Sequence, residues 1–346
     1  MNEQKKPSFI KRLTQKKTFT LICMYIILVV IFAVWSAIRG SNFLTLANLK
    51  NILNSLVVTS FLTLGAGCLL IGGYLDLAQS SIGCFGSMML ATAIAAWNLP
   101  WWLAIIAALV LCAVFGVLNA LMVTKLHFPA FIATMAMASM VKGLMYVFSS
   151  MGNNGVAANI NFTNDATFFI GRGNIIDIPL SNGDALTIPF GVVVMIVFFI
   201  FFGILMSKTA FGMKVTLMGG SPVAATLAGI NAEGLTIILF VISAVMGGIG
   251  GIFNAARLSQ GALTALTTNQ FTGLTAAILG GISFGGGVGG MGGAFVGLLI
   301  LNTFQIGMSF VGVNPFWVNV FSGVLLLLAL ALDFIAMSRK SKALAH

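Results

Sequence analysis

The sequence predicts an all-α, polytopic membrane protein with about ten transmembrane helices. Hydrophobic residues make up 59% of the 346 residues and charged residues only 7%, whereas soluble domains carry roughly 25% charged residues. Apolar runs recur along the whole chain, many of them near the roughly 20 residues that cross a bilayer. We therefore expect one transmembrane domain at 18–337, with short tails at 1–17 and 338–346.

The expected spans follow one another with short polar breaks. The first run, 18–38, is too long for the core of a cleavable signal peptide, so we interpret it as a retained span. In 42–56, apolar residues recur at helical spacing between polar ones, which predicts a helix lying in the membrane interface. The remaining spans are expected at 56–73, 82–97, 101–123, 130–149, 188–206, 235–256, 271–284, 290–311 and 316–337, some of them short and interrupted by glycine.

Lysines and arginines predict the orientation. With the N-terminus inside, the inner segments hold twelve basic residues and the outer segments four, as the positive-inside rule requires. Both termini and the loop 207–234 are then cytoplasmic, and the loop 150–187 is external. The net charge of +10 lies beside apolar runs, so it indicates a membrane surface and lipid rather than nucleic acid.

The cytoplasmic segment 207–234 contains the signals of a short helix. Ser221 is a good N-cap because its hydroxyl can accept from a free amide of the first turn. Pro222 suits the first helical position, where no amide is needed. Gly229 suits a left-handed stop. These signals predict a two-turn helix, preceded by the pair Gly219 and Gly220.

This short helix has two contrasting faces by the i, i+3 and i+4 spacing. Three larger apolar side chains share one face: Val223, Leu227 and Ile230. Three side chains of a single carbon form a second, nearly smooth face that we expect to be free: Ala224, Ala225 and Ala228. Such a helix fits a groove on another protein; the alternative is a plain connector on the membrane surface.

The motifs of common enzymes and pumps are missing from the sequence. There is no GxxxxGK[ST], so the chain carries no P-loop, and we expect no cofactor or metal in it. The cysteines lie inside apolar runs and read as buried apolar residues. No chain of carboxylates suits proton or sodium coupling. Energy for uphill transport would then come from another protein acting on 207–234.

The polar residues within the apolar runs are the candidates for a hinge or a path. Asp76 lies in GGYLDLAQSS, and a charge at membrane depth indicates function by default; the alternative is a cap on free amides of the next helix. Neutral amides suit the hydroxyls of a small uncharged solute, or else bond helix to helix. The candidates are Gly72, Gly73, Asp76, Gln79, Asn119, Lys142, Asn269, Gln270, Asn302 and Gln305.

Glycine is abundant, with 40 residues, and is concentrated in 271–298. In lipid, small residues let helix backbones approach closely, while interrupted helices also use glycine to bend. Tight packing or a moving hinge are the two interpretations. The positions are Gly280, Gly281, Gly285, Gly286, Gly289 and Gly292.

Five blocks in order resemble the permease subunits of ribose-type ABC sugar importers, over about 42–337. They are NFLTLANLKNIL, GGYLDLAQSSIGCFGSMML, FPAFIATMAMASMVKGLMYVFS, TAFGMKVTLMGGSPVAATLAGIN and LTAAILGGISFGGGVGGMGGAFVGLLIL. The resemblance makes 207–234 the coupling-helix loop and Asp76 the acidic residue of the hinge. Lys142 stands where arginine is more usual.

The resemblance implies a homodimeric permease in a bacterial inner membrane. A cytoplasmic ATP-binding subunit would dock on the coupling helices, and an external solute-binding protein would deliver a monosaccharide. ATP would belong to the partner subunit. The alternatives are a permease for nucleosides or branched-chain amino acids, and an autonomous secondary carrier, which would have no need of a docking helix in 207–234.

Overall fold

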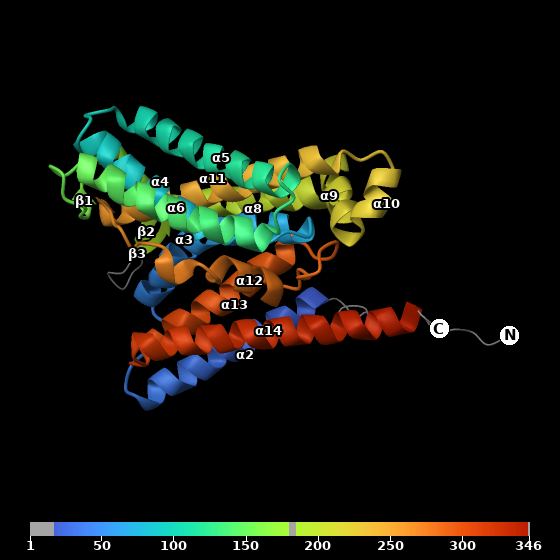
Figure 1. Cartoon of the computed structure of the whole chain (residues 1–346). Coiled ribbons are helices and arrows are strands. Elements are labelled where there is room, and N and C mark those ends of the chain that lie inside the picture. Colours follow the sequence, from blue (N-terminus) through green and yellow to red (C-terminus); the bar gives the residue numbers. More distant parts are fainter. Residues whose placement is uncertain (1–16, 180–184, 345–346) are drawn as a thin grey trace.

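The computed structural model describes residues 17–179 and 185–344, and this part of the chain is mostly helical (Figure 1). Within it, eight helices are long and apolar enough to cross a membrane. They are α2 (Lys17–Ile38), α3 (Leu46–Ile71), α5 (Trp101–Thr124), α6 (Ala130–Met151), α8 (Phe190–Lys208), α11 (Ala232–Leu258), α13 (Met291–Phe310) and α14 (Pro315–Leu344). The prediction of a helical, polytopic membrane protein is confirmed.

Two of the ten expected spans are short helices. The run 82–97 corresponds to α4 (Gln79–Ala95), with 17 residues, and the run 271–284 to α12 (Thr272–Leu279), with 8 residues. At about 1.5 Å per residue they reach about 26 and 12 Å, less than the roughly 30 Å of a hydrocarbon core. A break that contains Gly72 and Gly73 precedes α4, and a break that begins with Gly280 and Gly281 follows α12. Both breaks bend the chain within the bundle.

The prediction of an interfacial helix at 42–56 is wrong, because this segment leads into the continuous helix α3. Thr45 caps α3 by accepting from the Asn48 amide. The Asn48 side chain, which the sequence places on a polar face, is buried and donates to the Phe43 carbonyl at 2.8 Å. This local bond satisfies the polar group, so the helix enters the bundle without a break.

Small elements lie at the two ends of the bundle (Figure 1). One end carries α7 (Asp165–Arg172), the antiparallel pair β1 (Ile160–Asn161) with β4 (Gln260–Gly261), and the antiparallel hairpin β2 (Asn174–Pro179) with β3 (Ala185–Pro189). Next to β4 in sequence is η1 (Thr267–Asn269). The opposite end carries α9 (Ala210–Gly220), α10 (Pro222–Leu227) and the last turns of α14.

The core forms around α11, which contacts α3, α4 and α5. Glycines allow the closest of these contacts: a Cβ added to Gly251 would lie 1.9 Å from the Gly83 carbonyl oxygen. Backbones can meet at this distance only without side chains. At the other side of the molecule, α2 and α14 flank α13 and expose most of their apolar side chains (Figure 1).

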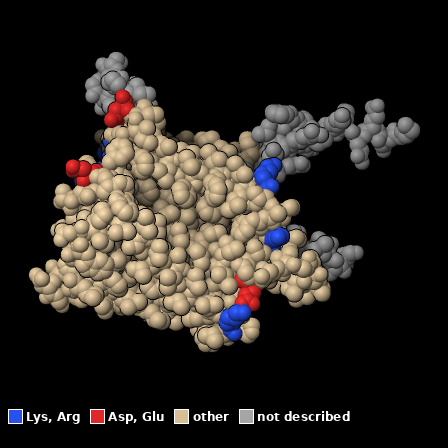
Figure 2. Space-filling model, turned by 90° about the horizontal axis from the view of Figure 1, so that it is seen from above, with Lys and Arg blue, Asp and Glu red and all other residues tan. Residues whose placement is uncertain are grey.

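Charged residues lie only at the edges of the face seen in Figure 2. Lysine, arginine, aspartate and glutamate appear at the two ends of the bundle, and a broad uncharged belt separates them. A belt of this kind is what the hydrocarbon core of a bilayer requires.

The tails fall partly outside the described residues. This holds for 1–16 of the expected tail 1–17 and for 345–346 of the expected tail 338–346. The helix α14 continues to Leu344, beyond the expected end of the last span at 337.

Candidate functional site

The short helix expected after Ser221 is present as α10 (Figure 1). The Ser221 hydroxyl accepts from the Ala224 amide at 3.2 Å, and Pro222 occupies the first helical position. The chain then turns at Gly229, whose φ of 74° lies in the left-handed region, where glycine carries no steric penalty. Local capping chemistry therefore predicted both ends of this helix.

The faces of α10 differ from the expectation at two residues, Ala225 and Ile230. Ala225 is only 2% exposed, because it packs against the body of the protein; the expectation that it lies on a free face is wrong. The exposed surface of α10 instead carries Val223 and Leu227, which are 72% and 84% exposed, together with Ala224 and Ala228. Ile230 does not share their exposure and packs partly against the core.

Three chain segments meet by their backbones directly behind α10. We call this the glycine junction, formed by Gly72, Gly73, Gly219, Gly220, Gly286 and Gly287. A Cβ on Gly219 would lie 1.9 Å from the Ile71 carbonyl oxygen and 2.7 Å from the Gly287 amide nitrogen. A hydrogen bond of 2.9 Å from the Gly287 amide to the Ile71 carbonyl crosses the same point.

The glycine junction connects three segments that are far apart in the sequence. The end of α9, just before α10, touches both the end of α3 and the loop that leads to α13. A Cβ on Gly286 would lie 2.7 Å from both the Gly219 oxygen and the Gly73 Cα. The segment that leads into α10 is therefore linked to two loops through backbone contacts.

The other glycines of the 271–298 block have different surroundings. A Cβ at Gly280 would lie 2.3 Å from the Gly293 oxygen, and one at Gly285 would lie 2.8 Å from the Met337 sulfur. Gly281 and Gly289 have φ angles of 91° and 125°, which favour glycine. Gly292 differs, since a Cβ there meets nothing within 4 Å among the described residues, so the packing interpretation does not hold for it inside this chain.

Asp76 lies in the break between α3 and α4 and is buried. One carboxylate oxygen accepts from the Ala78 amide at 2.8 Å, and the other accepts from the Ser243 hydroxyl of α11 at 2.8 Å. The neighbouring Leu77 amide donates to the Thr134 hydroxyl of α6. Asp76 thus caps an amide at the start of α4, as one of the two expectations states, and also ties the break to α11.

Gln79 binds the same turn of α11 as Asp76. Its side-chain nitrogen donates to the Ser243 carbonyl at 3.3 Å, and it fills the space beside Gly65, where a Cβ would lie 2.1 Å from that nitrogen. Asp76 and Gln79 therefore fix the break between α3 and α4 to α11 through two groups of Ser243, its hydroxyl and its carbonyl oxygen. This hinge cluster consists of Asp76, Gln79, Thr134 and Ser243.

The remaining polar candidates do not form one site. Asn119 is fully buried in α5, and its side chain finds no hydrogen-bond partner within the described residues. Asn302 donates to the Ser55 hydroxyl at 2.9 Å and so joins α13 to α3. Lys142 is half-buried in α6. Asn269 and Gln270 lie half-buried in and directly after η1, which contacts α4 and α12.

Gln305, one of the candidates for a path, lines a small polar cavity together with residues that are not among the candidates. The cavity measures about 190 Å³ and lies between α12, α13 and α14. Gln305 donates to the Ser322 hydroxyl at 3.1 Å, and Asn319, Thr272 and Thr275 also line the space. Asn319 and Ser322 are three residues apart on α14, a spacing that places them on one face and that could have been read from the sequence.

Asp333 is another residue that the candidates omit. Its carboxylate accepts from the Ser283 hydroxyl at 3.1 Å and from the Phe284 amide at 2.9 Å. These bonds hold the loop that contains Gly286 and Gly287 onto α14. The glycine junction is therefore supported from the side that faces away from α10.

Comparison with known proteins covers nearly the whole chain. Residues 48–330 match the family described as branched-chain amino acid transport system / permease component. The ribose import permease protein RbsC of Escherichia coli (strain K12) is 30% identical over 308 residues, which are 89% of this chain and 92% of the relative. No solved structure matches the chain.

Two further relatives have similar coverage. The galactose/methyl galactoside import permease protein MglC of Haemophilus influenzae is 27% identical over 344 residues, 95% of this chain and 99% of the relative. The L-arabinose ABC transporter permease protein AraH of Azospirillum brasilense is 30% identical over 307 residues, 89% and 85% of the two chains. The resemblance stated from the sequence blocks is thus confirmed.

The matched region contains the hinge cluster, the glycine junction and α10. The members of this family are permease components and are not catalytic, so the chain is not an enzyme. Like them, it is a multi-pass protein of the bacterial inner membrane. The chain belongs to the branched-chain amino acid transport system / permease component family, among relatives that are import permeases for monosaccharides.

Proposed function

We propose that this chain, as a homodimer, forms the path through which an ATP-driven importer takes up a monosaccharide delivered by an external solute-binding protein. The single observation that carries the proposal is the similarity to ribose, galactose and L-arabinose permeases over at least 85% of both chains. The arrangement of α10 and the hinge cluster supports it independently of those names.

The exposed face of α10 is suited to docking a partner. Val223 and Leu227 project as two large apolar side chains from a short, capped helix at one end of the bundle. Exposed apolar side chains on a helix are the usual anchors of a helix held in a groove. In this proposal the groove belongs to a cytoplasmic ATPase subunit, which binds and hydrolyses ATP, and the permease itself carries no cofactor.

The positions of the chain ends support a cytoplasmic location for α10. The start of α2 and the end of α14 lie at the same end of the bundle as α10 (Figure 1). The segment before α2 and the last turns of α14 are rich in lysine and arginine, and such residues favour the cytoplasmic side. The opposite end, with α7 and the β-hairpin, would then receive the solute-binding protein.

The glycine junction offers a route from the ATPase to the path. An ATPase can shift a conformational equilibrium only if it binds the two states with different affinity. Displacement of α10 would press on the α3 end, next to the break that Asp76 fixes to Ser243. The hinge cluster would then respond in α4, α6 and α11 together, since it has a residue in or beside each of them.

The size of the polar cavity favours a second copy of the chain. Solute pockets in proteins usually measure about 300–1,000 Å³, whereas the cavity at Gln305 has about 190 Å³. The helix α14, which lines it, carries many exposed apolar residues. A homodimer that joins two such faces would enlarge the cavity into a path between the copies.

The lining of the cavity favours an uncharged solute. Gln305, Asn319 and Ser322 provide amide and hydroxyl groups, and no charged residue lines the space within the described chain. Sugar hydroxyls can both donate to and accept from such groups. A branched-chain amino acid carries two charges at neutral pH, so the alternative that the family description suggests fits this cavity less well than a sugar or a nucleoside.

The test is purification of the tagged chain in mild detergent, followed by mass spectrometry of co-purifying proteins. We expect a P-loop ATPase in stoichiometric amount. Leu227→Glu should lower its recovery at least tenfold, because it places a charge on the docking face. The matched control is Leu126→Glu, which changes another exposed leucine in the loop after α5 and should leave the recovery unchanged.

Two results would contradict the proposal. One is recovery of the wild-type chain without an ATPase, together with solute movement in liposomes that contain this chain alone, which would establish a secondary carrier. The other is equal ATPase recovery with wild type and Leu227→Glu, which would make α10 a plain connector.

A further inference from the structure

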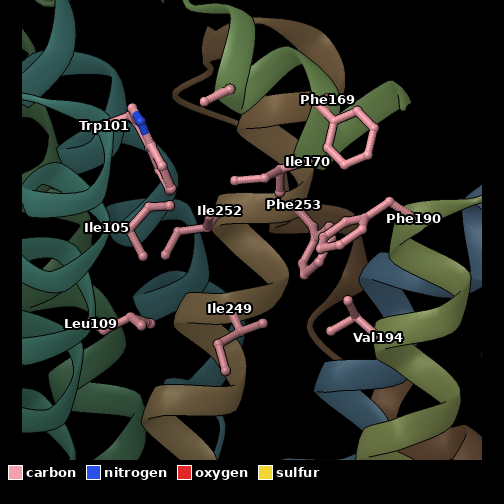
Figure 3. Close-up of a pocket in the computed structure, with 11 residues that line it drawn as sticks. Trp101, Ile105, Leu109, Phe169, Ile170, Phe190, Val194, Ile249, Ile252 and Phe253 are labelled. Carbon is pink, nitrogen blue, oxygen red and sulfur yellow. The ribbon is translucent and has the colours of Figure 1, made fainter. Parts of the chain in front are cut away.

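An apolar groove runs along the side of the bundle, away from the polar cavity. It has a volume of about 600 Å³, and all eleven lining residues are apolar. Figure 3 shows Trp101 and Leu109 of α5 on one wall, Phe190 and Val194 of α8 on the other, and Phe253 of α11 at the back. The indole N–H of Trp101 is the one polar side-chain group of this lining (Figure 3), which is too few for a sugar, so the groove is not part of the proposed path.

The groove has the length of one leaflet of a bilayer. From Trp101 to Leu109 it follows eight residues of α5, about 12 Å at 1.5 Å per residue. Half of a hydrocarbon core about 30 Å thick is about 15 Å. Trp101 starts α5 at the end of the bundle that carries α7 (Figure 1), and tryptophan is enriched at the membrane–water interface.

Two arginines lie at the end of the groove nearest Trp101 and α7. Arg257 follows Phe253 on α11 by four residues, and both line a small adjoining pocket together with Gly171 of α7. Arg172, the last residue of α7, donates through Nε to the Arg257 carbonyl. Two positive charges are therefore held together at the mouth of an apolar groove.

Neither arginine is neutralised by the described part of the protein. Arg257 donates to the Asn54 carbonyl at 3.4 Å, and the Arg172 guanidinium lies 5.4 Å from the centre of the Phe168 ring. No carboxylate among residues 17–179 and 185–344 forms an ion pair with either. Each guanidinium has five N–H donors, so donors remain for an anion, and Arg172 is exposed.

We propose that this groove binds one anionic phospholipid from the adjacent leaflet. The acyl chain lies along α5, α8 and α11, and the phosphate and an anionic headgroup lie on Arg172 and Arg257. Guanidinium groups recognise phosphate by paired, charge-assisted hydrogen bonds. A single zwitterionic lipid supplies the same acyl chain but no net charge, so the two arginines give the preference for an anionic headgroup.

The test is native mass spectrometry of the purified chain after exchange into detergent with equal amounts of phosphatidylglycerol and phosphatidylcholine. We expect one retained phosphatidylglycerol per chain, at least tenfold in excess of phosphatidylcholine. Arg172→Gln should remove the preference while leaving the apolar groove intact. Val194→Trp should fill the groove and reduce the retention of both lipids. Thermal unfolding of each variant verifies that the fold is kept.

The matched control is Arg39→Gln. Arg39 is an exposed arginine that follows α2 at the same end of the bundle, away from the groove. This variant should retain phosphatidylglycerol like the wild type. Equal retention of the two lipids by the wild type would overturn the proposal, as would an unchanged preference in Arg172→Gln or an equal loss in Arg39→Gln.

Discussion

Substitution of Gly219 by alanine tests whether the backbone contacts of the glycine junction matter for transport. The added Cβ would lie 1.9 Å from the Ile71 oxygen and 2.7 Å from the Gly287 nitrogen. Both are backbone atoms, so no side chain can rotate away, and the junction has to separate. The neighbouring Gly220→Ala is the matched control, since its Cβ would approach only the Gly287 Cα, at 3.9 Å.

The expected energies follow from two losses in Gly219→Ala. Overpacking a tight contact costs about 1–3 kcal/mol. Separation also breaks the hydrogen bond from the Gly287 amide to the Ile71 carbonyl, and a buried polar group left without a partner costs about 1–3 kcal/mol. The gain in helix propensity from alanine, about 0.5–1 kcal/mol, applies to both substitutions, so their difference is about 2–6 kcal/mol.

The assay compares ATP-dependent uptake and apparent melting temperature of the two variants at equal membrane levels. Because about 1.4 kcal/mol corresponds to a factor of ten, we expect Gly219→Ala to reduce uptake at least tenfold and to melt at a lower temperature. Gly220→Ala should resemble the wild type in both measurements. Equal uptake and equal melting temperature of the two variants would refute the role of the junction.

Three further predictions follow from single contacts. Asp76→Asn keeps one acceptor oxygen and loses the other, so it should reduce uptake more than membrane insertion; an unchanged uptake rate would make the bond to Ser243 irrelevant to transport. Ala225→Arg forces a charge into a buried contact and should lower the melting temperature, which an unaltered melting curve would contradict. Lys125→Gln removes the exposed ion pair with Glu233, typically worth less than about 1 kcal/mol; a loss of several kcal/mol in a denaturation series would show that the pair is stronger than its exposure implies.

Local chemistry explains which parts of the site could be predicted. The ends of α10 depend on Ser221, Pro222 and Gly229, which act on their own neighbours. The capping role of Asp76 is equally local, since the Ala78 amide is two residues away. Such signals are contained in a few consecutive residues and need no knowledge of the tertiary fold.

The missed features depend on contacts between distant segments. Ser243 lies 167 residues after Asp76, and nothing in either segment specifies the other. The burial of Ala225 is missed for the same reason: its small side chain permits close packing against the body of the protein, while Leu227, Ala224 and Ala228 stay exposed. Five of the six glycines of the junction are among the candidates, and Gly287 is missed; their meeting is a property of the fold.

The most direct test of the proposed function is uptake by proteoliposomes. The chain would be reconstituted alone and with its co-purified ATPase, and labelled pentoses and hexoses would be offered with the solute-binding protein outside and ATP inside. We predict uptake of one monosaccharide only when the ATPase, ATP and the binding protein are all present. Equal uptake by the chain alone, without ATP, would contradict the account.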